Sequence, residues 1–143
     1  MREPVREAWL DTNVIVRLVA GDGTAEMRAG ARRLLASAAE GRLVLRLHPL
    51  VIGECLHVLS GLYRGQRAET SRTLRVLLHR PGVQAVERPQ ALRALSLWEQ
   101  RAGLHFVDCY LIASAEASGH AVASFDGGIR RAGLVPVVDA ASA

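Results

Sequence analysis

The sequence contains no lysine, and all eighteen of its basic residues are arginines. A buried acid must therefore find its counter-charge in arginine, a helix N-terminus or a metal ion. Only two cysteines are present, Cys55 and Cys109, which excludes a disulfide framework; both lie in apolar segments, where we expect buried thiols. No apolar run approaches the ~20 residues of a membrane-spanning helix, and residues 1–7 lack the apolar stretch of a signal peptide. These absences predict a cytosolic protein that does not enter a membrane.

The chain is 143 residues long and half hydrophobic, which is enough for one domain over residues 1–143 with a substantial core. Its net charge is +4. Arginine holds phosphate through a planar, two-pronged fork, so this charge permits a nucleic-acid partner. It does not require one, because exclusive use of arginine can equally reflect the codon bias of a genome.

Apolar periodicity and capping residues predict an alternation of strands and helices. Strands are expected at 8–10, 43–47, 83–86, 120–124 and 134–138. Helices are expected at 14–20, 24–40, from Pro49 onward, 68–79, 89–101, 107–117 and 126–131. Five short strands separated by helices predict an α/β fold with a central, mainly parallel five-stranded sheet covered on both faces.

Four acidic residues stand apart from the solvated majority because apolar residues surround them. Asp11 and Asp126 each follow a predicted strand, so both should lie at the carboxyl edge of the sheet, where ligands bind in such folds. Glu54 and Asp108 lie within apolar helical segments, where an unpartnered carboxylate would be costly to bury. Each alone can be structural: Asp11 can cap the helix that follows it, and Asp108 lies near the start of its own helix.

Taken together, the four acids predict a metal site. Two carboxylates ~4 Å apart repel each other by about 4 kcal/mol at an effective dielectric constant near 20, so a group of four would need cations. Oxygen-only ligand sets favour hard ions such as Mg²⁺ or Mn²⁺. We therefore expect the four acids to cluster.

The same residues resemble the motifs of the PIN-domain family. Asp-Thr-Asn at 11–13 is similar to its opening motif, and Glu54 in an apolar helix resembles its second acid. Phe-Val-Asp-Cys-Tyr-Leu-Ile-Ala around Asp108 resembles its third motif, and Ser-Phe-Asp at 124–126 its fourth. The resemblance covers nearly the whole chain, in order. It implies a three-layer α/β/α fold, and the chain's length looks most like a VapC-type toxin of a toxin–antitoxin pair.

The resemblance also implies an activity: metal-dependent cleavage of RNA, with Mg²⁺ or Mn²⁺ held by the four acids and with 3′-hydroxyl and 5′-phosphate products. Asp126 could act through water. Thr12, Asn13 and Ser124 could orient carboxylates or waters, or merely cap helices. Three arginines near the expected edge are candidates for contacts to phosphate, with simple solvation as the alternative: Arg17, Arg130 and Arg131.

Other classes fit the sequence less well. A zinc site from Cys55, His57, His105 and Cys109 lacks the paired spacing of such sites. A phosphoacceptor receiver domain needs a lysine, and a haloacid-dehalogenase-type phosphatase needs a second aspartate where Asn13 stands. The non-enzymatic alternative is a PIN-like binding or scaffold module without catalytic activity.

The expected partners follow from the resemblance and from apolar surface. The segments 50–62 and 74–78 carry apolar residues on more than one face, which suits a buried helix, a homodimer interface or an antitoxin groove. PIN-domain toxins are usually dimers that bind a cognate antitoxin.

Overall fold

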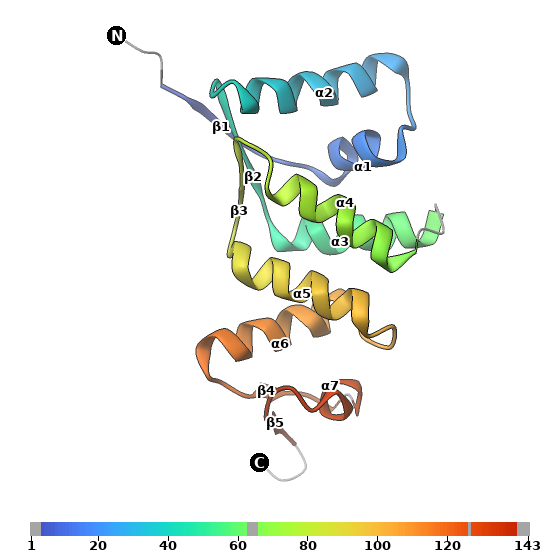
Figure 1. The fold of residues 1–143 in the computed structure, drawn as a ribbon, viewed down its shortest axis with the longest axis vertical. Helices are drawn as coiled ribbons and strands as arrows, with labels where there is room; N and C mark the ends of the chain where they lie inside the picture. Colours follow the sequence, from blue (N-terminus) through green and yellow to red (C-terminus); the bar gives the residue numbers. More distant parts are fainter. Residues whose placement is uncertain (1–3, 63–65, 126, 140–143) are drawn as a thin grey trace. The chain divides into compact units, whose positions relative to one another are not determined.

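A computed structural model describes residues 4–62, 66–125 and 127–139 of the chain. The chain divides after Arg88 into an N-terminal and a C-terminal part, and each part is described by itself. Figure 1 labels the elements of both parts. The described helices all stay below the length and apolarity that crossing a membrane requires.

The N-terminal part is a parallel sheet with helical connections. Its elements are β1 (Arg6–Trp9), α1 (Thr12–Ala20), α2 (Ala25–Ala39), β2 (Leu43–Leu47), α3 (Pro49–Leu62), α4 (Arg67–Leu78) and β3 (Val83–Ala85). The strands pair in the order β1-β2-β3, and β2 is central. Leu45 and Leu47 of β2 are almost fully buried, which makes this strand the middle of the local core.

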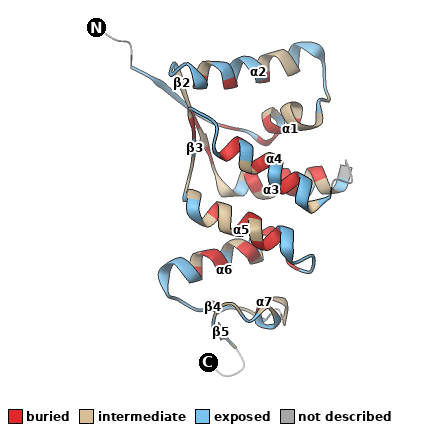
Figure 2. Cartoon of the chain, in the orientation of Figure 1, coloured by how far each residue is buried: buried red, intermediate tan, exposed pale blue. Residues whose placement is uncertain are grey.

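The helices of this part begin where local chemistry allows them to begin. Thr24 accepts a hydrogen bond from the backbone N–H of Met27 at 3.1 Å and so caps α2. Pro49 occupies the first turn of α3, where its missing N–H costs nothing. Figure 2 shows buried positions recurring along α3 and α4, as expected for helices that turn one side to a core.

The C-terminal part contains α5 (Arg88–Gln100), α6 (Phe106–Ser118), β4 (Val122–Ala123), α7 (Gly127–Ala132) and β5 (Val137–Val138). Its two strands pair in parallel, with Val122 opposite Val137. Leu95, Cys109 and Ile112 are fully buried and form the centre of its apolar packing.

The α/β class, the five strands and their parallel pairing are confirmed. The described strands, however, lie in two sheets of three and two strands rather than in one central sheet. β4 and β5 are two residues each, shorter than the expected strands at 120–124 and 134–138. Apolar character alone does not set strand length, because a strand extends only as far as its backbone finds a hydrogen-bonding neighbour.

Candidate active site

Asp11 lies at the point where β1 ends and α1 begins. The N–H of Leu10 donates to the carbonyl of Arg46 at 2.8 Å, which keeps the chain beside β2 as it leaves the strand. Asp11 is the N-cap residue of α1, with an extended backbone (φ −92°, ψ 151°). Its side chain makes no capping hydrogen bond within the described structure, and the residue is exposed. The carboxylate is therefore open to a ligand rather than committed to the helix.

Glu54 projects from the exposed side of α3. Its neighbours Ile52, Cys55 and Leu56 are almost fully buried and fix the orientation of the helix. The hydroxyl of Thr12 donates to Glu54 Oε2 at 2.8 Å, although the two residues are 42 positions apart. Thr12 itself is 7% exposed. A buried hydroxyl at the start of α1 thus holds one carboxylate oxygen of α3 in place.

The charges of both acids of this part affect the thiol of Cys55. Burial raises the pKa of Cys55 to about 12, with further upward contributions from the negative charges of Glu54 and Asp11 and an opposing hydrogen bond from Thr12. Both carboxylates therefore act on the same buried group. A thiol with this pKa stays protonated near neutral pH and is a poor nucleophile or metal ligand.

Asp108 lies in the first turn of α6, in the C-terminal part. Its Oδ2 accepts a hydrogen bond from the backbone N–H of His105, the N-cap residue, at 3.0 Å. Phe106, Cys109 and Ile112 are buried and anchor the helix. The residue is half-buried, and one oxygen of its carboxylate stabilises the helix start.

The remaining candidate residues have different surroundings. Asn13 is exposed, and Ser124 is half-buried just after β4. Arg17 forms an ion pair with Asp22 at 2.9 Å, and Arg130 one with Asp139 at 3.3 Å. Arg131 is exposed on α7, and Asp126 lies outside the described residues.

The structure differs from the expectation that apolar flanks bury the acids. Asp11 and Glu54 are exposed. Neighbours in a helix point about 100° apart, so Cys55 in α3 is buried while Glu54 beside it is not. Sequence reasoning considered Cys55 as a buried thiol and as a ligand of a less favoured zinc site, and it missed the effect of both acids on this thiol, although Cys55 directly follows Glu54.

The candidate metal ligands among the described residues are carboxylate oxygens. Across residues 4–62, 66–125 and 127–139, no group of three or more histidine, cysteine, aspartate and glutamate side chains is close enough to hold a metal. The N-terminal part contributes the pair Asp11 and Glu54, and the C-terminal part contributes Asp108. Two carboxylates near each other, one of them oriented by a hydroxyl, suit a hard divalent cation better than zinc.

Comparison with known families gives a match over most of the chain. The family model described as PIN domain matches residues 8–134, a span that contains all four acids. PIN domains have a mixed α/β fold and are generally Mg²⁺-dependent nucleases. Comparison with curated proteins found no match. Because the family match covers most of the chain, the chain belongs to the PIN-domain family.

Proposed function

We propose that this PIN domain is an endoribonuclease that uses Mg²⁺ or Mn²⁺ to hydrolyse RNA phosphodiester bonds. The metal would be held by four acids, directly or through water: Asp11, Glu54, Asp108 and Asp126. The observation that carries the proposal is the Asp11–Thr12–Glu54 group. It offers two neighbouring carboxylates, one oriented by a 2.8 Å hydrogen bond, in a chain that belongs to a family of nucleases.

The residues of this group have separable roles in the proposed reaction. The exposed carboxylate of Asp11 is open to a cation, while Thr12 limits the rotation of the Glu54 carboxylate and so prepares it for binding. A bound Mg²⁺ or Mn²⁺ would lower the pKa of a water molecule and neutralise charge that develops on the phosphate. The products should be a 3′-hydroxyl and a 5′-phosphate.

The test is an RNA-cleavage assay in Mn²⁺ with wild type, Asp11→Asn and Glu54→Gln. Both variants keep the size of the side chain and remove its charge, so each should lose cleavage by a factor of at least about 100 while thermal unfolding without metal stays near wild type. A variant that cleaves as wild type does would remove its residue from the site. A wild type that binds RNA but does not cleave it in Mg²⁺ or Mn²⁺ would favour the binding-module alternative.

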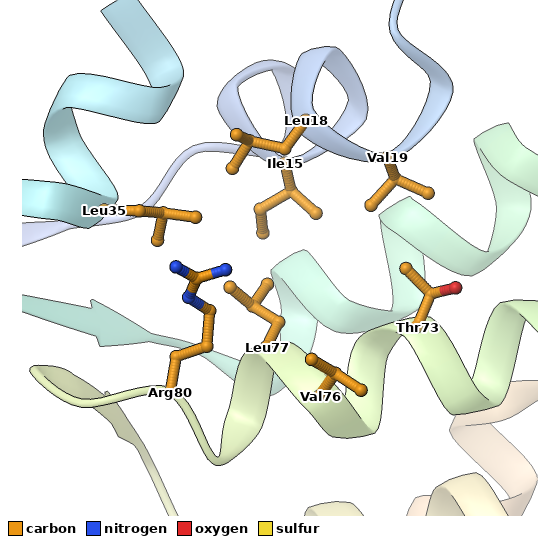
Figure 3. A pocket seen from close by; sticks show the side chains of 8 residues that line it. All are labelled: Ile15, Leu18, Val19, Leu35, Thr73, Val76, Leu77 and Arg80. Carbon is orange, nitrogen blue, oxygen red and sulfur yellow. The ribbon is translucent and has the colours of Figure 1, made fainter. Parts of the chain in front are cut away.

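We further propose that the chain acts as the toxin of a toxin–antitoxin pair in the cytoplasm, and that its antitoxin docks in an apolar hollow of the N-terminal part. The hollow has a volume of about 260 Å³. Figure 3 shows the side chains around it, which come from α1, α2, α4 and the residues just after α4. It is lined by Ile15, Leu18, Val19, Leu35, Thr73, Val76, Leu77 and Arg80. An apolar helix with an acidic residue for Arg80 would suit this lining.

Val76 gives a direct test of this docking surface because it lines the hollow and is 59% exposed. The protein would be produced together with any short reading frame that adjoins its gene. Val76→Arg should abolish co-purification of the two chains without reducing RNA cleavage. Retention of the complex would rule out this hollow, and absence of any complex with wild type would count against the toxin assignment.

A homodimer is the other proposed assembly. On α6, Val107 is 65% exposed and Leu111, one turn later, is 44% exposed, so two apolar side chains share one surface of the helix. If this surface forms the dimer, light scattering should give twice the monomer mass for wild type and the monomer mass for Val107→Glu with Leu111→Glu. A wild type that stays monomeric over a wide concentration range would contradict the proposal.

A further inference from the structure

Three arginines were candidates for contacts with phosphate, and their surroundings distinguish them. The guanidinium of Arg17 lies 2.9 Å from Asp22, and that of Arg130 lies 3.3 Å from Asp139. These two charges are already compensated by neighbouring carboxylates. Arg131 is exposed and forms no ion pair within the part of the chain that the structure describes. Its charge is therefore available for an anionic ligand.

The guanidinium of Arg131 lies against Gly127 at the start of α7. A Cβ built on Gly127 would lie 2.6 Å from Arg131 Nη1 and 3.4 Å from its Cζ, so the guanidinium packs directly over the glycine backbone. Any larger residue at 127 would displace the end of this flexible side chain. The missing Cβ of Gly127 leaves room for the guanidinium of Arg131, so this glycine matters for the position of that side chain rather than for the backbone conformation.

Arg131 lines a hollow of about 300 Å³ in the C-terminal part. The other lining residues are Arg101, Gly103, Leu104, Gly128 and Ala132. Two arginines and two glycines among these six described residues give a concave surface with positively charged and very small side chains. Among the residues that the structure describes, the lining contains no acid, and small residues next to arginine are the chemistry that recognises phosphate.

We propose that this hollow binds a backbone phosphate of the RNA through Arg131, and that Gly127 positions the arginine for it. The inference rests on the proposed function, since it takes RNA as the ligand. Gly127 directly follows Asp126, the fourth predicted acid, so the phosphate would be bound close in sequence to the catalytic set. Arg131 is a binding residue in this account, and Gly127 is a positioning residue.

The test is fluorescence anisotropy with a labelled single-stranded RNA in EDTA, where binding is measured without cleavage. Arg131→Gln should raise Kd about five- to tenfold and reduce the slope of log K against log salt by about 0.7, as expected for one lost phosphate contact on a single strand. Gly127→Ala should weaken binding similarly. It keeps the net charge, so its effect cannot come from a general loss of positive charge.

Arg33→Gln is the matched control, because Arg33 is exposed on α2 and its loss changes the net charge by the same amount. It should leave Kd within about twofold. Equal binding by wild type, Arg131→Gln and Gly127→Ala would overturn the inference while leaving the nuclease proposal intact. The same loss in Arg33→Gln and Arg131→Gln would overturn it too. Absence of RNA binding by wild type, together with no cleavage in Mn²⁺, would refute both.

Discussion

Replacing Thr12 by valine tests the hydrogen bond on which the candidate site depends. Valine keeps the shape and the β-branch of threonine, so the change removes the hydroxyl without opening a cavity. Thr12 is 7% exposed, and its hydroxyl lies 2.8 Å from Glu54 Oε2. Hydrogen bonds to charged groups contribute about 1.5–3 kcal/mol, but Glu54 is exposed and solvent weakens the interaction. We therefore expect Thr12→Val to lower the free energy of unfolding by about 1 kcal/mol.

The effect on metal binding should be larger than the effect on stability. Residues that orient a metal-binding carboxylate typically contribute about 10- to 100-fold to metal affinity. Thr12→Val should therefore weaken Mn²⁺ binding by at least about tenfold. Thr12→Ser keeps the hydroxyl and loses only a methyl group. It should keep most of the metal affinity while losing roughly 1 kcal/mol of stability from the smaller buried side chain.

Two measurements separate these contributions. Urea unfolding without metal gives the stability of the three proteins, and calorimetric titration with Mn²⁺ gives their affinities. If Thr12→Val and Thr12→Ser lose metal affinity equally, the hydroxyl does not orient Glu54 for the metal. If Thr12→Val binds Mn²⁺ as tightly as wild type, Glu54 is not a ligand or needs no orientation, and the reasoning fails.

Three further predictions concern Cys55, Gly82 and Asp108. The thiol of Cys55 has a pKa of about 12 in the folded protein against an ordinary value of 9.0. The free energy of unfolding should therefore fall by about 4 kcal/mol for this group as pH rises from about 9 to 12, and this group should cause no change below pH 9. Urea unfolding of Cys55→Ala at several pH values should lack this component. Gly82 has φ +81°, and a Cβ there would lie 2.3 Å from the carbonyl oxygen of Ala38. Gly82→Ala should therefore lower the free energy of unfolding by more than about 2 kcal/mol in the same assay, and a smaller decrease would contradict the close packing. Asp108→Asn keeps an oxygen that can accept from the His105 N–H, so thermal unfolding without metal should stay near wild type while RNA cleavage and stabilisation by Mn²⁺ decrease; equal stabilisation and intact cleavage would remove Asp108 from the site.

Local signals in the sequence predicted most elements of the fold. The strand expected at 43–47 has those bounds, and the helix expected from Thr24 begins there because its side chain caps the first turn. α1 begins at Thr12, earlier than expected, since Asp11 rather than Asn13 is the N-cap residue. Pairing between strands was harder to predict, because it depends on contacts between distant segments that no local pattern encodes.

The candidate site was predicted unevenly for a similar reason. Apolar neighbours were taken to mean burial, and this was wrong for Glu54, whose helix buries the residues beside it instead. The rule about strand ends was more useful. It placed Asp11 at an edge of the sheet, and Glu54 lies in the helix that follows the neighbouring strand. That Asp126 and Asp108 join them in one metal site stays a prediction.

The contact between Thr12 and Glu54 follows from the register of β1 and β2. The strands run in parallel with Trp9 opposite Arg46, so both end at the same edge of the sheet, where β1 leads into α1 and β2 leads into α3. A slip of one residue would move α1 by about 3.3 Å along the strand, more than the tolerance of a hydrogen bond. The ion pair between Arg46 and Glu7, at 3.1 Å, is exposed and contributes little to this register.

The register must therefore depend mainly on the backbone ladder and on the buried side of β2. The Leu10 N–H bond to the Arg46 carbonyl extends the ladder one residue beyond β1, up to the residue before Asp11. Leu45 and Leu47 are 2% and 1% exposed, and a slip by one position would turn both toward the opposite face of the sheet. Burying these two leucines thus also fixes where Thr12 meets Glu54, so the apolar core and the candidate metal ligands are set by the same pairing of strands.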